Sequence, residues 1–133
     1  MRIALISCSK RKAAYACSAQ EMYSKSALFN KAIKYCRHHQ YDLIFILSAK
    51  YGALSPTDEI DTYELSLNQF SPTEIENWAE KCSKFLLKKC GSESQFDFSA
   101  GKNYFEELSK RLPKANNILK GLGIGERLRF LSV

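Results

Sequence analysis

The stretch Tyr41–Leu65, YDLIFILSAKYGALSPTDEIDTYEL, decides which fold the chain is expected to adopt. It opens with an apolar run, Leu43–Leu47, that is typical of a strand buried on both faces of a parallel sheet. The run ends abruptly in Ser48–Gly52, SAKYG, which joins a hydroxyl, a cation, a phenol and a glycine. In open α/β sheets ligands bind at the carboxyl ends of the strands. We therefore expect a binding site where this strand ends.

The first residues of the chain repeat the same design. After Arg2, the apolar run Ile3–Ile6 leads into Ser7-Cys8-Ser9-Lys10. Two strands that each end in a serine, a small residue and a lysine predict one shared anion-binding rim, with both turns enclosing a single pocket. On this rim, Lys10 and Lys50 are the expected anion-binding residues, and a solvated loop lysine is the alternative for each.

The rest of the chain alternates helix and strand. Residues 19–40 have helical apolar spacing, with a helix start near Ser24 or Ser26, and residues 71–91 open with a capping box and end at a glycine. Residues 94–99 predict a third strand nearer the edge of the sheet, and residues 101–112 a third helix ended by a proline. This order predicts one domain over residues 1–133, a three-layer α/β/α fold with a small, mainly parallel sheet.

Composition sets further bounds. The chain has 133 residues, a net charge of +6 and an apolar fraction of 45%, as expected for an ordered domain that can meet a polyanion. Its five cysteines form no Cys-x-x-Cys pair, so we expect reduced thiols, no metal and no cofactor. No apolar run approaches the roughly 20 residues that span a bilayer, and the first residues do not resemble a signal peptide. We expect a cytoplasmic protein without a membrane partner, and leave its oligomeric state open.

The C-terminal stretch 117–131, NILKGLGIGERLRFL, carries a glycine-rich turn. Its spacing matches the hairpin of a helix-hairpin-helix, in which free amides at a helix start receive a DNA phosphate. The residues expected to contact DNA are Lys120, Gly121, Gly123, Gly125 and Arg127. The alternative is an ordinary glycine turn that packs a final helix on the sheet; a dinucleotide-binding fingerprint fits less well.

Several motifs together resemble a known family. SAKYGALSP at residues 48–56, followed by Tyr63-Glu64-Leu65, resembles the YaaA peroxide-stress proteins. CSKRK at residues 8–12 and YSKSALF at residues 23–29 are similar to motifs of small bacterial and phage members, and more distantly to the PCS-motif core of archaeosine synthases. The resemblance covers roughly residues 3–65 and the glycine turn at 119–125. It implies a uracil-DNA-glycosylase-like fold, DNA binding through a helix-hairpin-helix, and a role in nucleobase damage or modification.

Candidate roles follow from the residue types. A carboxylate after the SAKYG turn can activate water, and Asp58 is the first choice because it directly follows the Ser55-Pro56 turn. Tyr51 can stack on an extruded base, and Cys8 can act as a nucleophile or be a buried thiol. The residues expected in catalysis are Cys8, Lys50, Asp58 and Glu59. The residues expected to bind the substrate are Ser9, Lys10, Tyr23, Ser26, Ser48, Tyr51 and Gly52.

These expectations leave three classes of function open. The first is an enzyme that hydrolyses the N-glycosidic bond of, or modifies, a nucleobase or nucleotide in the pocket at the carboxyl edge. The second is a non-catalytic DNA-binding module of the YaaA type. The third is a small nucleotide hydrolase. The expected partner is accordingly a nucleic acid, in the first place DNA, or a nucleotide.

Overall fold

A computed structural model of the protein describes residues 1–132. Its main sheet has five strands in the order β4-β3-β1-β6-β7. Their bounds are β1 Arg2–Ser7, β3 Leu43–Ser48, β4 Gly52–Leu54, β6 Gln95–Ser99 and β7 Ala115–Asn117. All neighbouring pairs are parallel except β3 with β4. A second, two-stranded sheet pairs β2 (Cys17–Ser18) with β5 (Glu59–Ile60). The expected mainly parallel sheet is confirmed.

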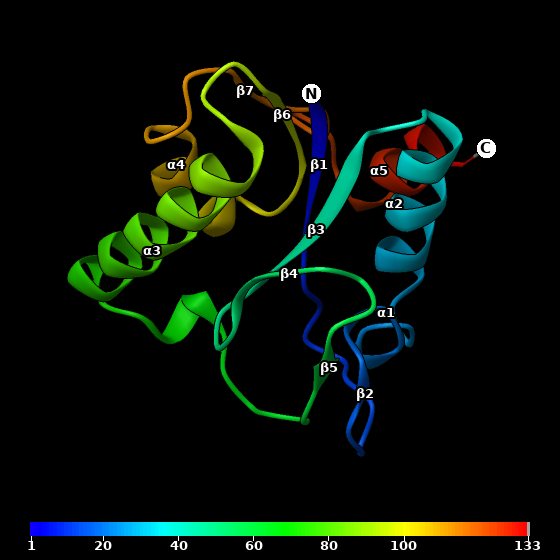
Figure 1. Cartoon of the computed structure of the whole chain (residues 1–133). Coiled ribbons are helices and arrows are strands. Elements are labelled where there is room, and N and C mark those ends of the chain that lie inside the picture. The colour runs from blue at the N-terminus through cyan, green and yellow to red at the C-terminus, as the bar shows by residue number, and fades with distance from the viewer. Residues whose placement is uncertain (133) are drawn as a thin grey trace.

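Helices cover both faces of the main sheet (Figure 1). Their bounds are α1 Ala19–Met22, α2 Ala27–His38, η1 Leu67–Gln69, α3 Pro72–Cys90, α4 Lys102–Ser109 and α5 Ile124–Phe130. Helices α2 and α5 pack on one face, whereas α3 and α4 pack on the other. This arrangement confirms the three-layer α/β/α fold. No helix within residues 1–132 has the length and apolar character needed to cross a membrane.

Strand β1 lies at the centre of both cores because its side chains alternate between the two faces of the sheet. Ala4 and Ile6 belong to the cluster under α2, and Ile3 and Leu5 to the cluster under α3 and α4. All four side chains are at most 1% exposed. The continuous apolar run in the sequence is therefore the signature of a strand covered on both sides.

The helix starts follow the sequence signals. Helix α2 begins after Ser26, whose hydroxyl accepts a hydrogen bond from the amide of Phe29. Helix α3 begins after Ser71, where the predicted capping box with Glu74 is complete. It ends at Gly91, whose φ of +88° suits a residue without a side chain.

Strand β6 lies second from the edge of the sheet and thus nearer the edge than β1, as predicted, although it pairs with β1 on one side and with β7 on the other. The predicted end of the third helix is wrong. Helix α4 ends at Ser109 rather than Leu112, since the next residues close three-residue turns. Between β4 and α3, residues 55–70 hold the short strand β5 and the 3-10 helix η1.

The glycine turn is not part of a helix-hairpin-helix. The strand β7 precedes it, so the turn joins a strand to the single helix α5. Its φ > 0 residue is Gly121, at +80°. Leu119 and Leu131, on either side of the turn and helix, are buried in the cluster under α2. This geometry corresponds to the alternative, an ordinary glycine turn that packs a final helix.

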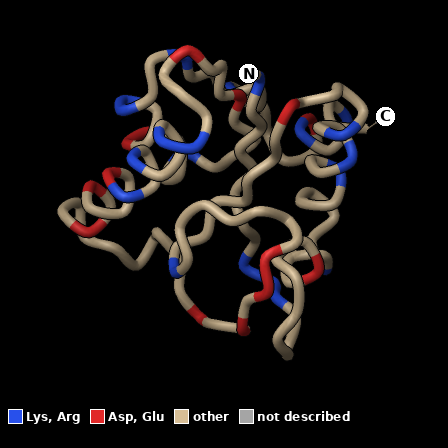
Figure 2. Tube along the Cα trace, viewed as in Figure 1, with Lys and Arg blue, Asp and Glu red and all other residues tan. Residues whose placement is uncertain are grey.

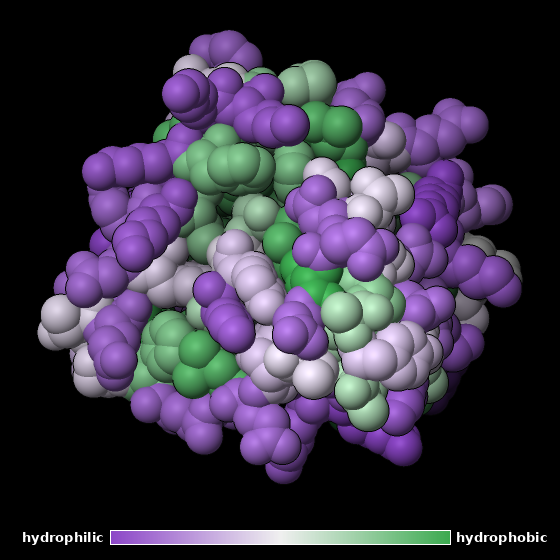
Figure 3. Space-filling model, turned by 60° about the horizontal axis from the view of Figure 1, so that its bottom comes forward, coloured by the Kyte–Doolittle hydropathy of each residue, from purple (hydrophilic) through white to green (hydrophobic). Residues whose placement is uncertain are grey.

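Charge and hydrophobicity are distributed rather than concentrated. Lys and Arg are spread over several elements of the chain (Figure 2). Figure 3 turns the lower end of the molecule in Figure 1 toward the viewer, which brings the carboxyl ends of the parallel strands forward. Hydrophobic side chains show there as separate green areas between hydrophilic ones. Neither view shows one large charged or apolar face.

Candidate ligand-binding site

A cavity of about 370 Å³ lies at the carboxyl edge of the sheet, where β1 and β6 end side by side. Residues 7–9 at the end of β1 and residues 99–101 at the end of β6 both line it. From β1 the chain passes through α2 to β3 on one side, and from β6 it passes through α4 to β7 on the other. The two loops therefore leave toward opposite faces of the sheet. This is the topological switch point at which open α/β proteins bind ligands.

Two helices begin at the cavity. The first residues of α4, with the N-cap Gly101, line it from one side, and Ser26 and Leu28 at the start of α2 line it from the other. The first-turn amides of a helix have no acceptor within the helix, and the aligned peptide dipoles make this end positive. Gly101 has no side chain to cap α4, and its amide donates to the Ser7 hydroxyl at 3.3 Å. Both helix starts favour an anion in the cavity.

Two cationic side chains add to this positive charge. Lys102 and Arg127 line the cavity, and no Asp, Glu or His is among its lining residues within the described chain 1–132. The Nε of Arg127 donates to the Leu122 carbonyl at 2.9 Å, which fixes the guanidinium relative to the glycine turn. The Nζ of Lys102 lies 3.6 Å from a carboxylate oxygen of Glu106 on the exposed surface. The balance of charge at the cavity is positive.

Ser99 supplies an unusual polar group. It is only 4% exposed and lines the cavity, yet its hydroxyl has no hydrogen-bond partner in the described residues. An unsatisfied buried hydroxyl costs about 1–3 kcal/mol, and such groups are rare in folded proteins. A cavity-lining hydroxyl of this kind can form a hydrogen bond with a ligand that enters the cavity.

Cys8 and Tyr104 form the polar contact in the cavity wall between the loop after β1 and helix α4. The Sγ of Cys8 and the Oη of Tyr104 are 3.1 Å apart. Burial raises the pKa of the Tyr104 phenol well above its usual range, and the neighbouring Cys8 raises it further. Tyr104 therefore keeps its proton near neutral pH, and its hydroxyl can donate a hydrogen bond to the sulfur. The ring of Trp78 packs edge-on against Tyr104, with centroids 5.6 Å apart.

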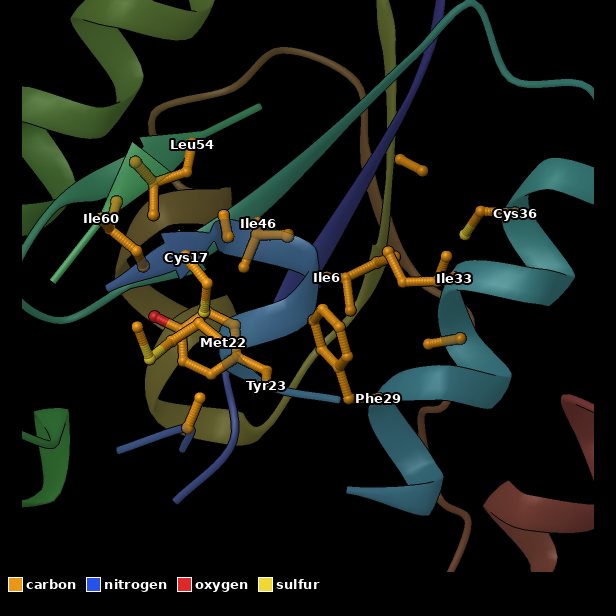
Figure 4. Packing of buried hydrophobic residues seen from close by; sticks show 14 of the residues in the cluster. Ile6, Cys17, Met22, Tyr23, Phe29, Ile33, Cys36, Ile46, Leu54 and Ile60 are labelled. Carbon is orange, nitrogen blue, oxygen red and sulfur yellow. The ribbon is translucent and has the colours of Figure 1, made fainter. Parts of the chain in front are cut away.

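The wall formed with α2 is apolar. Ile6 from β1 and Leu28, Phe29 and Leu119 line it. Figure 4 shows Ile6 and Phe29 close together between the sheet and α2, with Tyr23 nearby. The Tyr23 and Phe29 ring centroids are 5.5 Å apart. The cavity thus joins an apolar wall to a polar, positively charged rim.

The two strand ends that were expected to form one rim lie side by side, but they do not enclose the cavity. The turns after β1 and β3 do lie side by side, because β1 pairs with β3 and the Cys8 amide donates to the Leu47 carbonyl at 2.9 Å. However, Lys10 and Lys50 do not line the cavity. Lys10 is exposed, and the Nζ of Lys50 lies over the Tyr51 ring, 5.3 Å from its centroid. The cavity opens between β1 and β6 instead.

Two of the predicted substrate-binding residues belong to a buried hydroxyl network. The Oη of Tyr63 lies 2.6 Å from the Oη of Tyr23 and 2.8 Å from the Oγ of Ser48. Both Tyr23 and Ser48 are fully buried. Burial raises the pKa of Tyr23 to about 12 and raises that of Tyr63 still more. These groups satisfy one another, which is a structural role.

The predicted carboxylates lie outside the cavity. The Oδ2 of Asp58 accepts the Ser55 amide at 2.9 Å and closes the turn after β4, and Glu59 is exposed in β5. Tyr51 is likewise outside the cavity, and its Oη donates to the Asp61 carbonyl at 3.3 Å. Gly52 forms the start of β4, with a φ of +74°. None of these four predicted residues lines the cavity.

Of the predicted site residues, the cavity brings together Cys8, Ser9, Ser26 and Arg127. The other residues of the glycine turn that were expected at DNA, Lys120, Gly121, Gly123 and Gly125, are exposed. At the start of α5 the Glu126 carboxylate accepts the Gly123 amide at 3.2 Å, so a negative group already occupies that end of the helix. A phosphate is disfavoured there.

Sequence reasoning missed the half of the cavity at the end of β6, and Asn68 in η1 beside it. The overlooked residues at β6 and α4 are Ser99, Lys102, Asn103 and Tyr104. A signal was present: Ser99-Ala100-Gly101-Lys102 follows its strand in the same way as Ser7-Cys8-Ser9-Lys10. Its significance depends on the pairing of β6 with β1, which joins residues far apart in the chain.

The chain belongs to a family of unknown function, DUF6884, which matches it over residues 3–133. No curated protein matches the sequence, and no solved structure matches it either.

Proposed function

We propose that this DUF6884 protein recognises a nucleotide, a nucleobase that carries a phosphate, in the cavity between β1 and β6. The observation that carries the proposal is one cavity with an apolar wall, surrounded by two helix starts, two cations and the Ser99 hydroxyl. Within residues 1–132 this hydroxyl has no partner and the cavity has no acidic lining residue. A cavity of about 370 Å³ falls in the range typical of small-molecule sites.

The phosphate is expected at the start of α4. The backbone amides of Lys102 and Asn103 lie in the first turn of that helix, and the side chains of Lys102 and Arg127 line the same cavity. Charge-assisted hydrogen bonds to phosphate oxygens are about twice as strong as neutral ones. The Ser99 hydroxyl, which has no other partner in residues 1–132, is a further donor for the phosphate.

The base is expected against the apolar wall. Leu28 and Phe29 from α2 provide a surface on which a flat ring can pack. Asn68 and Asn103 line the other side, and the Nδ2 of Asn103 donates to the Oδ1 of Asn68. A side-chain amide offers both donors and acceptors, which is the complement that a nucleobase edge requires. The pair is therefore suited to read the base.

The proposal is recognition rather than hydrolysis. The carboxylates that an N-glycosidic hydrolase needs as acid and base were expected at Asp58 and Glu59, and both lie outside the cavity. Binding requires only the groups named above. A nucleobase-modifying step would need a reactive group beside the base.

Isothermal titration calorimetry tests the proposal with three ligands: a nucleoside 5′-monophosphate, the same nucleoside without phosphate, and inorganic phosphate. The nucleotide is expected to bind most tightly. Arg127→Gln removes a cation from the cavity and is expected to weaken nucleotide binding by about 1.5–3 kcal/mol, roughly 10- to 150-fold in Kd. Arg129→Gln, on the exposed side of the same helix, is the matched control and should leave Kd within about twofold. Equal affinities for the nucleotide and the nucleoside would reject the proposal.

A second candidate is that the recognised nucleotide belongs to a nucleic acid strand, as in a DNA-binding module. The observation that favours it is the loop after β1: Ser9 lines the cavity, and the next two residues, Lys10 and Arg11, are exposed cations. Neighbouring phosphates of a strand would then meet these side chains. An oligonucleotide should bind more tightly than the mononucleotide and with a steeper dependence on salt concentration. Equal affinity and equal salt dependence would favour a free nucleotide.

A further inference from the structure

Cys8 occupies a position that no other cysteine of the chain shares. All five cysteines are free, and Cys17, Cys36 and Cys82 are buried. Cys8 and Cys90 are both half-buried, but only Cys8 lines the cavity. The pair therefore offers an internal comparison between two thiols of similar exposure in different surroundings.

The two thiols have opposite helix ends near them. Cys8 shares the cavity with the starts of α2 and α4 and with the cations Lys102 and Arg127. Cys90 is the last residue of α3, at the negative end of that helix. Burial raises the pKa of the Cys90 thiol, and the Lys89 ammonium and the N-terminal amine oppose this only in part. A thiolate is stabilised by helix starts and nearby cations. Cys8 has both around it, whereas Cys90 has cations but lies at a helix end.

Tyr104 adds a specific partner to the Cys8 sulfur. Its hydroxyl lies 3.1 Å from Sγ and can donate a hydrogen bond to a thiolate. The buried Ser99 hydroxyl, for which residues 1–132 offer no partner, indicates that the same cavity is shaped to receive a ligand. The sulfur thus lines a positively charged cavity that an anionic reagent can enter.

We propose that Cys8 is a site of thiol–disulfide exchange with small disulfides that carry negative charge, and that its modification and nucleotide binding exclude each other. In this step the Cys8 thiolate attacks one sulfur of the disulfide R–S–S–R. The Cys8–S–S–R bond forms as the original S–S bond breaks, and R–S⁻ leaves with the electron pair. The Cys8 sulfur is oxidised and the leaving sulfur is reduced. The exclusion rests on the proposed function, because the attached group fills the nucleotide cavity; the exchange itself does not.

The test compares two probes on the full chain under native conditions: the dianionic disulfide 5,5′-dithiobis(2-nitrobenzoate) and the neutral 2,2′-dithiodipyridine. Released thiolate gives the rate, and peptide mass spectrometry identifies the modified cysteine. We expect the anionic probe to modify Cys8 faster than Cys90 by on the order of tenfold. Added salt should slow this reaction more than that of the neutral probe. Cys8→Ser should remove the fast phase, and Cys90→Ser should retain it. Peptide mass spectrometry of the labelled chain without substitutions identifies the fast cysteine independently of both variants.

Two outcomes separate this inference from the proposed function. Fast labelling at Cys8 that a nucleoside 5′-monophosphate slows, but the nucleoside does not, supports both. Fast labelling at Cys8 with no slowing by the nucleotide supports the exchange site and overturns the exclusion together with the proposed function. Labelling of Cys90 before Cys8, or equal rates at both, overturns the inference even if calorimetry shows that the nucleotide binds.

Discussion

Replacing Ser99 by alanine should stabilise the protein and weaken its ligand binding at the same time. Ser99 is 4% exposed, and its hydroxyl has no hydrogen-bond partner in residues 1–132. Folding therefore removes this hydroxyl from water without replacing the hydrogen bonds it made there. Alanine removes the hydroxyl and keeps the rest of the side chain. A residue retained for binding, at a cost in stability, is expected to behave in this way.

The magnitude follows from the hydroxyl. A buried unsatisfied polar group costs about 1–3 kcal/mol, and the small void left by alanine offsets part of that gain. We expect a net stabilisation of about 1 kcal/mol, which for a chain of this size raises Tm by about 3–5 °C. Loss of one hydrogen bond to the phosphate should weaken nucleotide binding by about 1–2 kcal/mol, roughly 5- to 30-fold in Kd.

Urea unfolding followed by circular dichroism measures the first effect, and calorimetry with the nucleoside 5′-monophosphate measures the second. Ser94→Ala is the matched control. Ser94 is 1% exposed, but its hydroxyl donates to the Cys90 carbonyl at 2.8 Å, so this change should destabilise the protein and leave Kd unchanged. If Ser99→Ala destabilises the protein as much as Ser94→Ala does, the Ser99 hydroxyl has a partner within the fold and the reasoning fails.

Three further predictions concern stability, each measured by urea unfolding. Tyr63→Phe removes the central hydroxyl of the buried network and should lower the free energy of unfolding by roughly 2–4 kcal/mol. The control Tyr51→Phe loses one exposed hydrogen bond and should lower it by under about 0.5 kcal/mol. Equal losses would refute the stabilising role of the network. Because the pKa of Tyr23 is raised to about 12 in the folded state, its contribution is complete below about pH 10, where the unfolded phenol is still protonated, and is lost as the pH rises from about 10 to 12. A urea midpoint that does not fall between pH 10 and 12 would contradict this. Gly91→Ala should lower the free energy of unfolding by about 1–3 kcal/mol, because φ of +88° with ψ of 154° is essentially restricted to glycine. Gly125 lies in a helix with open space around it, so Gly125→Ala should be neutral or stabilising. A loss of stability at Gly125 as large as at Gly91 would refute the backbone argument.

The elements that could be predicted from the sequence are those whose signals are local. The apolar runs of β1 and β3, and the capping box at Ser71, each specify their structure within a few residues. Strand β7 is different, because its three residues, Ala115–Asn117, have no apolar alternation. They form a strand because β6 offers them an open edge for pairing. Because β7 was not predicted, the glycine turn that follows it was expected to belong to a helix-hairpin-helix.

The candidate site was half predictable for the same reason. The loop after β1 was recognised from its composition, and Cys8 and Ser9 do line the cavity. Which neighbouring loop closes the cavity depends on strand order, and strand order is set by pairings between residues far apart in the chain. Ser48 and Ser99 both follow apolar residues at the ends of strands adjacent to β1, yet Tyr63 satisfies the first hydroxyl and nothing in residues 1–132 satisfies the second. Only the three-dimensional arrangement distinguishes them.

Amide chemical shifts in a ¹⁵N-labelled sample test most directly whether the switch-point cavity holds a nucleotide by its phosphate. On titration with a nucleoside 5′-monophosphate, the largest shifts are predicted at the amides of Gly101, Lys102 and Asn103, at the start of α4, with smaller shifts at Leu28 and Phe29. The nucleoside without its phosphate should leave the three α4 amides unchanged. Largest shifts in the turn at residues 121–125 or in the loop at residues 55–61, or no shifts at a millimolar excess of nucleotide, would contradict the account.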